Sequence, residues 1–138
     1  MQMQTTVLKN SESLQKRAFV VGDETRICEL VSLILEDLGF QPMQIGQAEW
    51  LVETTAHINP ELIVWDLSQE KELSPFQSLS QIREQASIKK VKILFLGGPD
   101  AKKVMETYKG DAKVNFCLKP FSPTRFRDEI AQLYRVED

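Results

Sequence analysis

The chain has few of the features that mark extracellular, membrane-spanning or zinc-binding proteins. Its only two cysteines, Cys28 and Cys117, lie far apart and show no Cys-x-x-Cys spacing, so neither a disulfide framework nor a zinc knuckle is indicated. No run of about 18 apolar residues occurs, and the N-terminus lacks the roughly 7–15-residue apolar stretch of a signal peptide. We therefore expect a cytoplasmic protein that does not enter a membrane.

Motifs of several other functional classes are missing as well. The net charge is -3, the pI is near 5.3 and there is no basic stripe, which argues against a nucleic-acid partner. The serine-rich stretch 74–80 lacks the Gly-x-Ser-x-Gly elbow of hydrolases. No Gly-x-Gly-x-x-Gly or Walker sequence follows an apolar run. His57 has no partner at metal-ligand spacing and is interpreted as a surface residue.

The apolar residues that are present form short runs within one domain. The length of 138 residues, with 42% hydrophobic content, suits a single core. We predict a flexible N-terminal extension over 1–16 and one domain over 17–138. Runs rich in β-branched or aromatic residues predict strands at Ala18–Val21, Met43–Ile45, Leu62–Trp65, Val91–Leu96 and Val114–Leu118. Most of these runs are near-continuous, which is typical of parallel strands buried on both faces.

Helical segments alternate with the strands. In Thr25–Leu38 the apolar residues recur at three- and four-residue spacing, and Gly39 follows where a left-handed residue commonly ends a helix. Phe121 can form a hydrophobic staple with Phe126 at the start of the last helix. Further helices are predicted over Ala48–Ala56 and Asp100–Tyr108, and from the serine-proline pairs Ser74-Pro75 and Ser122-Pro123.

Five strand-helix repeats predict an α/β fold with right-handed crossovers. We predict a flavodoxin-like, doubly wound, five-stranded parallel sheet of order 2-1-3-4-5, with helices on both faces. In such sheets, ligands bind beyond the carboxyl ends of the strands, near the switch point between the first and third. The residues at these strand ends are therefore the candidates for function.

Charged and small residues occupy the predicted strand ends. The first strand is followed by Gly22-Asp23-Glu24, the third ends on Asp66, the fourth on Gly97-Gly98 and the fifth on Lys119-Pro120. Carboxylates that lie close together repel unless a cation joins them, and an oxygen-only site with open positions suits Mg²⁺. A lysine opposite them would balance charge and could hold a phosphoryl oxygen.

Three segments together resemble the receiver domain of bacterial response regulators, over roughly 16–134. They are Val20–Glu24, Pro60–Asp66 and Leu118–Phe121. The resemblance implies that an aspartate at the end of the third strand takes a phosphoryl group from a histidine kinase or phosphotransfer protein. It also implies that Mg²⁺ is held by acids after the first strand.

Residue roles follow from this resemblance. It implies that Asp66 is the phosphoacceptor and that Lys119 binds a phosphoryl oxygen. It implies that Asp23 is a direct Mg²⁺ ligand together with Asp66, and that Ser68 contributes its backbone carbonyl. Phe116 would be the aromatic switch residue. The Lys-Pro bond is usually cis in this family, which Lys119-Pro120 permits.

The chain also departs from the family pattern, so that we regard it as an atypical receiver. The first of two usual acids after the first strand is replaced by Gly22, which weakens the Mg²⁺ prediction unless Glu24 compensates. The usual Ser or Thr at the end of the fourth strand is Gly97, so a switch hydroxyl that would bind the phosphoryl group is missing. The Met-Pro often found after the phosphoacceptor loop is replaced by Gln69-Glu70, and the loop is one residue longer.

The leading hypothesis is thus a stand-alone receiver module that is phosphorylated on Asp66 and acts by contact with a downstream protein, with at most autodephosphorylation as enzymatic activity. One alternative is a pseudo-receiver that binds a partner without phosphorylation. Another is a small nucleotide or cofactor binder with Gly97-Gly98 as phosphate loop, although we interpret these glycines first as a tight turn.

Some residues also have a simpler structural interpretation. Asp23 could simply cap the following helix. Trp50 and Trp65 are interpreted as core or helix-covering residues.

Overall fold

The computed structural model describes residues 16–46, 49–67, 80, 91–98 and 101–135. Within this part of the chain, no helix is long and apolar enough to cross a membrane. The strands are β1 (Lys16–Val21), β2 (Phe40–Ile45), β3 (Leu62–Asp66), β4 (Lys92–Gly97) and β5 (Val114–Leu118). The helices are α2 (Thr25–Asp37), α3 (Glu49–His57), α5 (Lys102–Thr107) and α6 (Pro123–Arg135).

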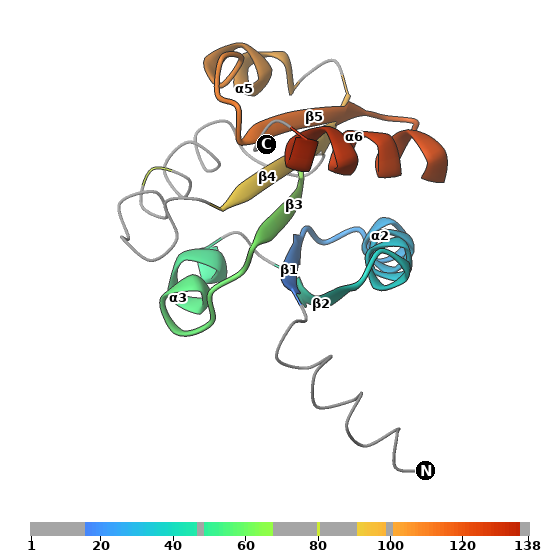
Figure 1. The fold of residues 1–138 in the computed structure, drawn as a ribbon. Coiled ribbons are helices and arrows are strands. Elements are labelled where there is room, and N and C mark those ends of the chain that lie inside the picture. The colour runs from blue at the N-terminus through green and yellow to red at the C-terminus, as the bar shows by residue number, and fades with distance from the viewer. Residues whose placement is uncertain (1–15, 47–48, 68–79, 81–90, 99–100, 136–138) are drawn as a thin grey trace.

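The strands form one parallel sheet of order β2-β1-β3-β4-β5, as the sequence predicts (Figure 1). In register, Val21 of β1 pairs with Trp65 of β3, and Asp66 pairs with Leu96 of β4. Gly97, the last residue of β4, pairs with Leu118 of β5. Because the strands are parallel, all of their carboxyl ends meet at one edge of the sheet.

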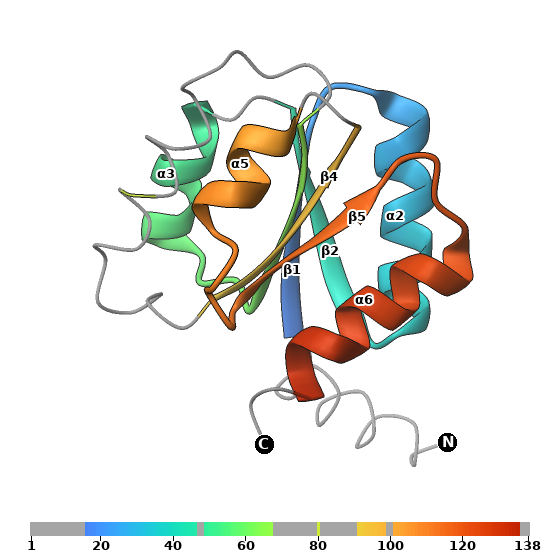
Figure 2. The same cartoon turned by 90° about the horizontal axis from the view of Figure 1, so that it is seen from above.

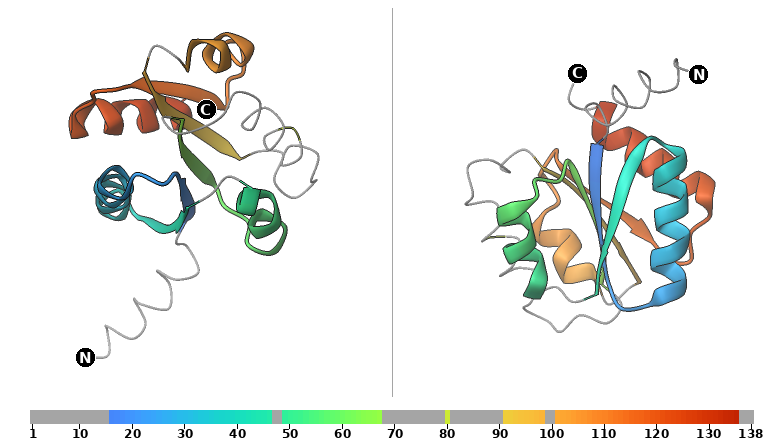
Figure 3. Two further views of the ribbon diagram at one scale, coloured as in Figure 1. Left: turned by 180° about the vertical axis from the view of Figure 1, so that it is seen from behind. Right: turned by 90° about the horizontal axis from the view of Figure 1, so that it is seen from below.

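The two faces of the sheet are covered by different pairs of helices. Helices α2 and α6 lie on one face and α3 and α5 on the other, as Figures 2 and 3 show. Successive strand residues point to opposite faces, so the sheet contributes to two cores. Under α2 and α6 the strands contribute Ala18, Val20, Leu62, Val64, Leu94, Leu96 and Cys117. Under α3 and α5 they contribute Phe19, Val21, Ile63, Trp65, Ile93, Phe95 and Val114.

The ends of the two long helices agree with most of the sequence signals. Gly39 follows α2 with φ of +97°, which confirms the predicted left-handed residue. At the start of α6, the Ser122 hydroxyl accepts a hydrogen bond from the Arg125 backbone N–H at 3.1 Å. The rings of Phe121 and Phe126 lie 5.7 Å apart, which confirms the staple. The predicted helix from Ser74-Pro75 lies outside the described residues.

Several sequence interpretations need correction. The N-cap position of α2 is occupied by Glu24, so the alternative in which Asp23 caps this helix is wrong. Trp50 is 55% exposed and is not a core residue, whereas Trp65 is fully buried as predicted. Strand β2 begins at Phe40, three residues before the predicted start, because pairing with β1 extends an edge strand in which only Phe40 and Ile45 are buried.

The first strand also differs slightly from its predicted bounds. β1 begins at Lys16, two residues before the apolar run that identified it. Lys16 and Arg17 are exposed, and their strand conformation is set by pairing with Phe40 and Gln41 of β2. The remaining part of the predicted extension, residues 1–15, lies outside the described residues. Hydrophobicity identified only the four buried residues of this strand, Ala18–Val21.

Candidate functional site

Three charged residues predicted to meet at the carboxyl ends of the strands form an ion-pair cluster. The Lys119 Nζ donates a hydrogen bond to Asp66 Oδ1 at 2.9 Å. The same ammonium lies 3.6 Å from Glu24 Oε1. These residues follow or end β5, β3 and β1, so segments far apart in the sequence supply them. The structure thereby confirms that Asp66 and Lys119 share one site.

Burial differs sharply across this cluster. The Asp66 side chain is 4% exposed, Lys119 is 19% exposed and Glu24 is 47% exposed. A hydrogen bond between charged groups is stronger where water is scarce, so the Asp66–Lys119 pair is the firmly held part. Glu24 lies at the solvent-facing rim, where its interaction with Lys119 is screened.

The end of β4 holds both members of the ion pair in place through the backbone. The Gly97 carbonyl accepts a hydrogen bond from the Lys119 N–H at 2.9 Å. The Leu96 carbonyl accepts one from Leu67, directly after Asp66, at 2.8 Å. The Lys119-Pro120 peptide bond is cis, as the resemblance implies. The acid and the lysine are therefore positioned by β4, the strand that lies between β3 and β5.

Gly22 lies in contact with the acid. Its φ is +155°, a value that side-chain-bearing residues rarely adopt. A Cβ atom at this position would lie 2.9 Å from the Asp66 Cβ, which is shorter than real Cβ contacts. The sequence interpretation treated Gly22 only as a lost metal ligand. The structure shows that the turn after β1 approaches Asp66 so closely that glycine is required.

Gly97 is enclosed in a similar way. A Cβ atom there would meet the Ala101 Cβ at 2.9 Å. The Gly98 carbonyl accepts a hydrogen bond from the Ala101 N–H at 3.0 Å, in agreement with the predicted tight turn. The place where a switch hydroxyl would stand is thus adjacent to a methyl group. A serine or threonine would require this turn to move.

Phe116 is fixed by aromatic neighbours. Its ring is stacked on Phe95, with centroids 5.5 Å apart and an interplanar angle of 21°. Phe95 also contacts Tyr108 at 6.1 Å and Trp65 at 5.7 Å. Phe116 is therefore partly buried and packs against the core under α3 and α5. The resemblance suggested a mobile switch residue, and this neighbourhood could not be read from the sequence because its members come from four separate segments.

The described residues do not by themselves make up a complete site for Mg²⁺. Asp23 is exposed and follows Gly22, and the buried Asp66 already bonds to Lys119. In the part of the chain that the structure describes, no group of three or more His, Cys, Asp and Glu side chains could hold a metal. Ser68, the proposed carbonyl ligand, lies outside the described residues. Gly22 has no room for a further acid, so Asp23 and Asp66, with Glu24 at the rim, are the acidic side chains that these described strand ends offer.

Cys28 lies close to the site, although the sequence indicated neither a disulfide nor a zinc site for it. Its Sγ is 3.7 Å from the Gly22 carbonyl oxygen. Burial raises the pKa of this thiol, and the charges of Asp66, Asp23 and Glu24 raise it further. The thiol is therefore sensitive to the charge at the strand ends. Its place in the first turn of α2, on the buried side, is the sequence signal that could have identified it.

Two hollows flank the turn that follows β1. One, of about 410 Å³, is lined by Glu24, Ile27, Leu30, Lys119, Pro120 and Phe121. The other, of about 360 Å³, is lined by Gly22, Asp23, Thr25, Cys28, Gln44, Gly46 and Trp50. Lys119 lines the first of these hollows, whereas Asp66, which is 4% exposed, lines neither.

The comparisons with known proteins support the fold. No protein-family model and no curated protein sequence matches the chain. Among solved structures, it is similar to the Vibrio cholerae chemotaxis protein CheY4, with a TM-score of 0.73 and 18% identity. That similarity covers 86% of this chain and 98% of CheY4.

Two other solved structures give the same result. A signal receiver domain of a histidine kinase from Syntrophus aciditrophicus has a TM-score of 0.71 at 19% identity, covering 88% of this chain and 91% of that one. A response regulator from Desulfuromonas acetoxidans has a TM-score of 0.71 at 17% identity, covering 88% and 98%. The chain thus has the flavodoxin-like fold of CheY-like receiver domains.

Proposed function

We propose that the protein is a receiver-type signalling module that accepts a phosphoryl group on Asp66. The observation that carries this proposal is the hydrogen bond from the Lys119 ammonium to the Asp66 carboxylate at the carboxyl ends of β3 and β5. It supports the proposal because a carboxylate nucleophile beside a fixed cation is what phosphoryl transfer to an aspartate needs.

In the proposed reaction, an Asp66 carboxylate oxygen attacks the phosphorus of the donor. A new O–P bond forms as the bond between phosphorus and its donor atom breaks, and the donor leaves with that electron pair. The Lys119 ammonium neutralises negative charge on the transferred oxygens. The donor would be a histidine kinase or a phosphotransfer protein, and the output would be contact with a downstream protein. The module would act as a phosphoacceptor and not as an enzyme.

Mg²⁺ remains part of the proposal, since a bound divalent cation would neutralise further phosphoryl charge. Asp23 and Asp66 are the acids available for it, with Glu24 at the rim and the Ser68 carbonyl as a predicted further ligand. Within the chain itself, Lys119 is the cation that balances the charge of Asp66. In the proposed reaction the nucleophile is the Asp66 carboxylate, with or without the metal.

The test is incubation with acetyl phosphate, followed by intact-mass measurement. We expect the wild type to gain one phosphoryl group that hydroxylamine removes, and Asp66→Asn to gain none. Asp128→Asn, which removes an exposed acid on α6, is the matched control and should be labelled like the wild type. Parallel reactions with Mg²⁺ and with EDTA measure the contribution of the metal. An unlabelled wild type, or labelling that survives Asp66→Asn, would refute the phosphoacceptor assignment.

A second candidate is a pseudo-receiver whose unphosphorylated surface binds a partner. The close contacts at Gly22 and Gly97 favour it, because they exclude a second acid and a switch hydroxyl at the strand ends. Under this alternative the wild type stays unlabelled in every condition. Proteins captured from a lysate by the wild type and by Asp66→Asn would then be the same. A set of partners that depends on acetyl phosphate treatment would contradict it.

A further inference from the structure

A separate cavity lies at the opposite end of the sheet from Asp66. It has a volume of about 280 Å³ and is lined by Lys16, Leu38, Gly39, Phe40, Arg127, Ile130, Ala131 and Tyr134. Lys16 opens β1 and Phe40 opens β2, so the cavity lies at the amino ends of these strands. β1 is six residues long, which separates its two ends by roughly 17 Å. The cavity therefore does not belong to the ion-pair site.

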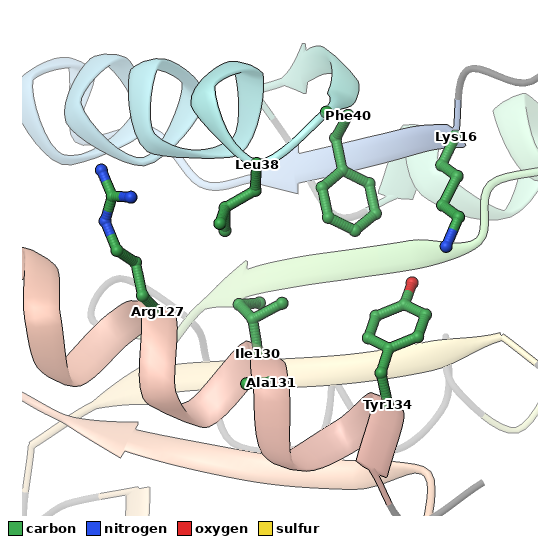
Figure 4. A pocket seen from close by; sticks show the side chains of 8 residues that line it. Lys16, Leu38, Phe40, Arg127, Ile130, Ala131 and Tyr134 are labelled. Atoms are coloured by element: carbon green, nitrogen blue, oxygen red, sulfur yellow. The ribbon is translucent and has the colours of Figure 1, made fainter. Parts of the chain in front are cut away.

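The walls of this cavity are mainly hydrocarbon. Figure 4 shows Leu38 and Phe40 facing Ile130 and Tyr134 of α6 across the opening. Phe40 and Tyr134 are in ring contact, with centroids 6.1 Å apart. Ala131 is exposed and lies at the rim. Ligand pockets usually measure about 300–1,000 Å³, so this cavity suits a small apolar group.

The charged groups at the cavity are cationic. Lys16 and Arg127 line it, and no acidic side chain is among the described residues that do. The Lys16 ammonium lies 4.9 Å from the centre of the Tyr134 ring, and the ammonium of the buried Lys92 lies 4.5 Å from the same centre. Arg127 lies at the other end of the cavity, where its guanidinium forms an ion pair with the Asp37 carboxylate at 3.0 Å. The cation that faces the apolar walls is therefore Lys16.

We propose that this cavity binds a small apolar carboxylic acid in its ionised form. The hydrocarbon part would lie on Leu38, Phe40 and Ile130, and the carboxylate would face the Lys16 ammonium at the Tyr134 end of the cavity. An anion is favoured because the site combines apolar walls with positive charge. This second site is independent of phosphorylation at Asp66, so each can be tested without the other.

The first experiment titrates the full chain with octanoate, below its micelle concentration, and follows backbone amide shifts by NMR. We expect saturable shifts at Leu38, Phe40 and Tyr134, and none at Leu30 and Phe121, which line a similar apolar hollow beside Lys119. Octan-1-ol and octylammonium are the uncharged and cationic controls. Equal binding of octylammonium, or shifts that are equal at both hollows, would overturn the proposal.

Two variants then test the residues. Ala131→Trp fills the rim from an exposed helix position and should abolish binding while the fold is retained. Lys16→Gln removes one cation and should weaken octanoate binding about tenfold, the loss expected for a charge-assisted hydrogen bond. Arg135→Gln removes an exposed cation at the end of α6 that does not line the cavity, and should bind like the wild type. Unchanged affinity in both Ala131→Trp and Lys16→Gln would exclude this cavity as the site.

Discussion

Four strand ends meet at the candidate site, and two of them carry charged residues while the other two carry glycine. β3 and β5 lead to charge, in Asp66 and Lys119, which bond to each other at 2.9 Å. β1 and β4 lead to glycine, in Gly22 and Gly97, and a Cβ atom at either one would come within 2.9 Å of a neighbouring Cβ. The ends of β3 and β5 therefore provide the charged side chains of the site. The ends of β1 and β4 allow the backbone to pass close to neighbouring residues.

This difference shows that the two glycines are more than missing functional groups. At Gly22 the atom that excludes a side chain belongs to Asp66 itself, so a second acid and the present position of the first acid are incompatible. At Gly97 the excluding atom belongs to Ala101. An acid at position 22 or a hydroxyl residue at position 97 would require the backbone to move. Substitutions at these two glycines should therefore lower the free energy of unfolding.

The largest expected effect is that of Gly22→Ala. The new methyl group would contact the Asp66 side chain, and the backbone would be strained at φ of +155°. Strain and overpacking together should lower the free energy of unfolding by about 4 kcal/mol. Urea denaturation measures this loss. Gly46→Ala is the matched control, because nothing lies within 4 Å of its Cβ position. A loss below that of Gly46→Ala would show that the glycine ends are not tightly packed.

The next effect is that of Lys119→Met, which removes the cation beside Asp66. The acid is 4% exposed, so breaking this pair should cost about 3 kcal/mol in unfolding free energy. Asp66→Asn in the same chain should recover part of the loss, as a double-mutant cycle would show. Arg125→Met breaks the pair with Glu129, in which Arg125 is 56% exposed, and should cost no more than about 0.5 kcal/mol. Equal losses for Lys119→Met and Arg125→Met would mean that the charged ends are not coupled.

Gly97→Ser should have a smaller effect than either. Gly97 does not have positive φ, so only the contact with Ala101 opposes the side chain. Overpacking of this kind costs about 1–2 kcal/mol, and urea denaturation again measures it. Gly97→Ser combined with Ala101→Gly should restore the stability lost through the contact. If Ala101→Gly does not reduce the stability loss caused by Gly97→Ser, the contact with the Ala101 side chain is not the cause of that loss.

The smallest expected effect is on the titration of Cys28. Burial and the nearby acids raise its pKa, so Asp66→Asn should lower that pKa. The ¹³Cβ shift of the cysteine follows the titration by NMR. Cys117 is the internal control: burial and Glu129 raise its pKa to about 11, and it should not respond to Asp66→Asn. If Cys28 keeps the same pKa in Asp66→Asn, the acid does not act on it.

The raised pKa values of both thiols make the free energy of unfolding depend on pH. A raised pKa means that the native state holds the thiol proton more tightly than the unfolded state does. Their contribution to stability is therefore complete below the ordinary thiol pKa and is lost as the pH rises through the raised values. The alkaline fall in unfolding free energy should be smaller in Cys117→Ala than in the wild type.

Much of the fold could be predicted from the sequence because the apolar runs are buried on both faces. Leu62–Trp65 and Val91–Leu96 identified β3 and β4 within one residue. The repeated strand-helix order predicted a parallel sheet, and the flavodoxin-like order chosen for it is the one observed. The edge strand β2 was predicted three residues short, since its exposed Gln41 and Met43 lack that signal. Pairing with a neighbour extends such a strand, and pairing is not encoded in local hydrophobicity.

The site was predictable only in part. Parallel strand ends must converge, so Asp66 and Lys119 could be brought together by topology alone. The tight contacts of Gly22 and Gly97 could not, because they depend on the positive φ of Gly22 and, at both positions, on Cβ atoms in other segments. The exposure of Trp50 was missed for a similar reason, since an aromatic residue in a helix is usually buried.

The two tryptophans differ completely in their surroundings: Trp65 is fully buried in the aromatic core and directly precedes Asp66, whereas Trp50 is 55% exposed. Iodide in solution can collide with the Trp50 indole but not with that of Trp65, so collisional quenching separates their emission. In a Trp50→Phe variant the remaining emitter would be one residue from the acid. The chain therefore carries a built-in optical reporter of events at Asp66, and no dye needs to be attached to observe them.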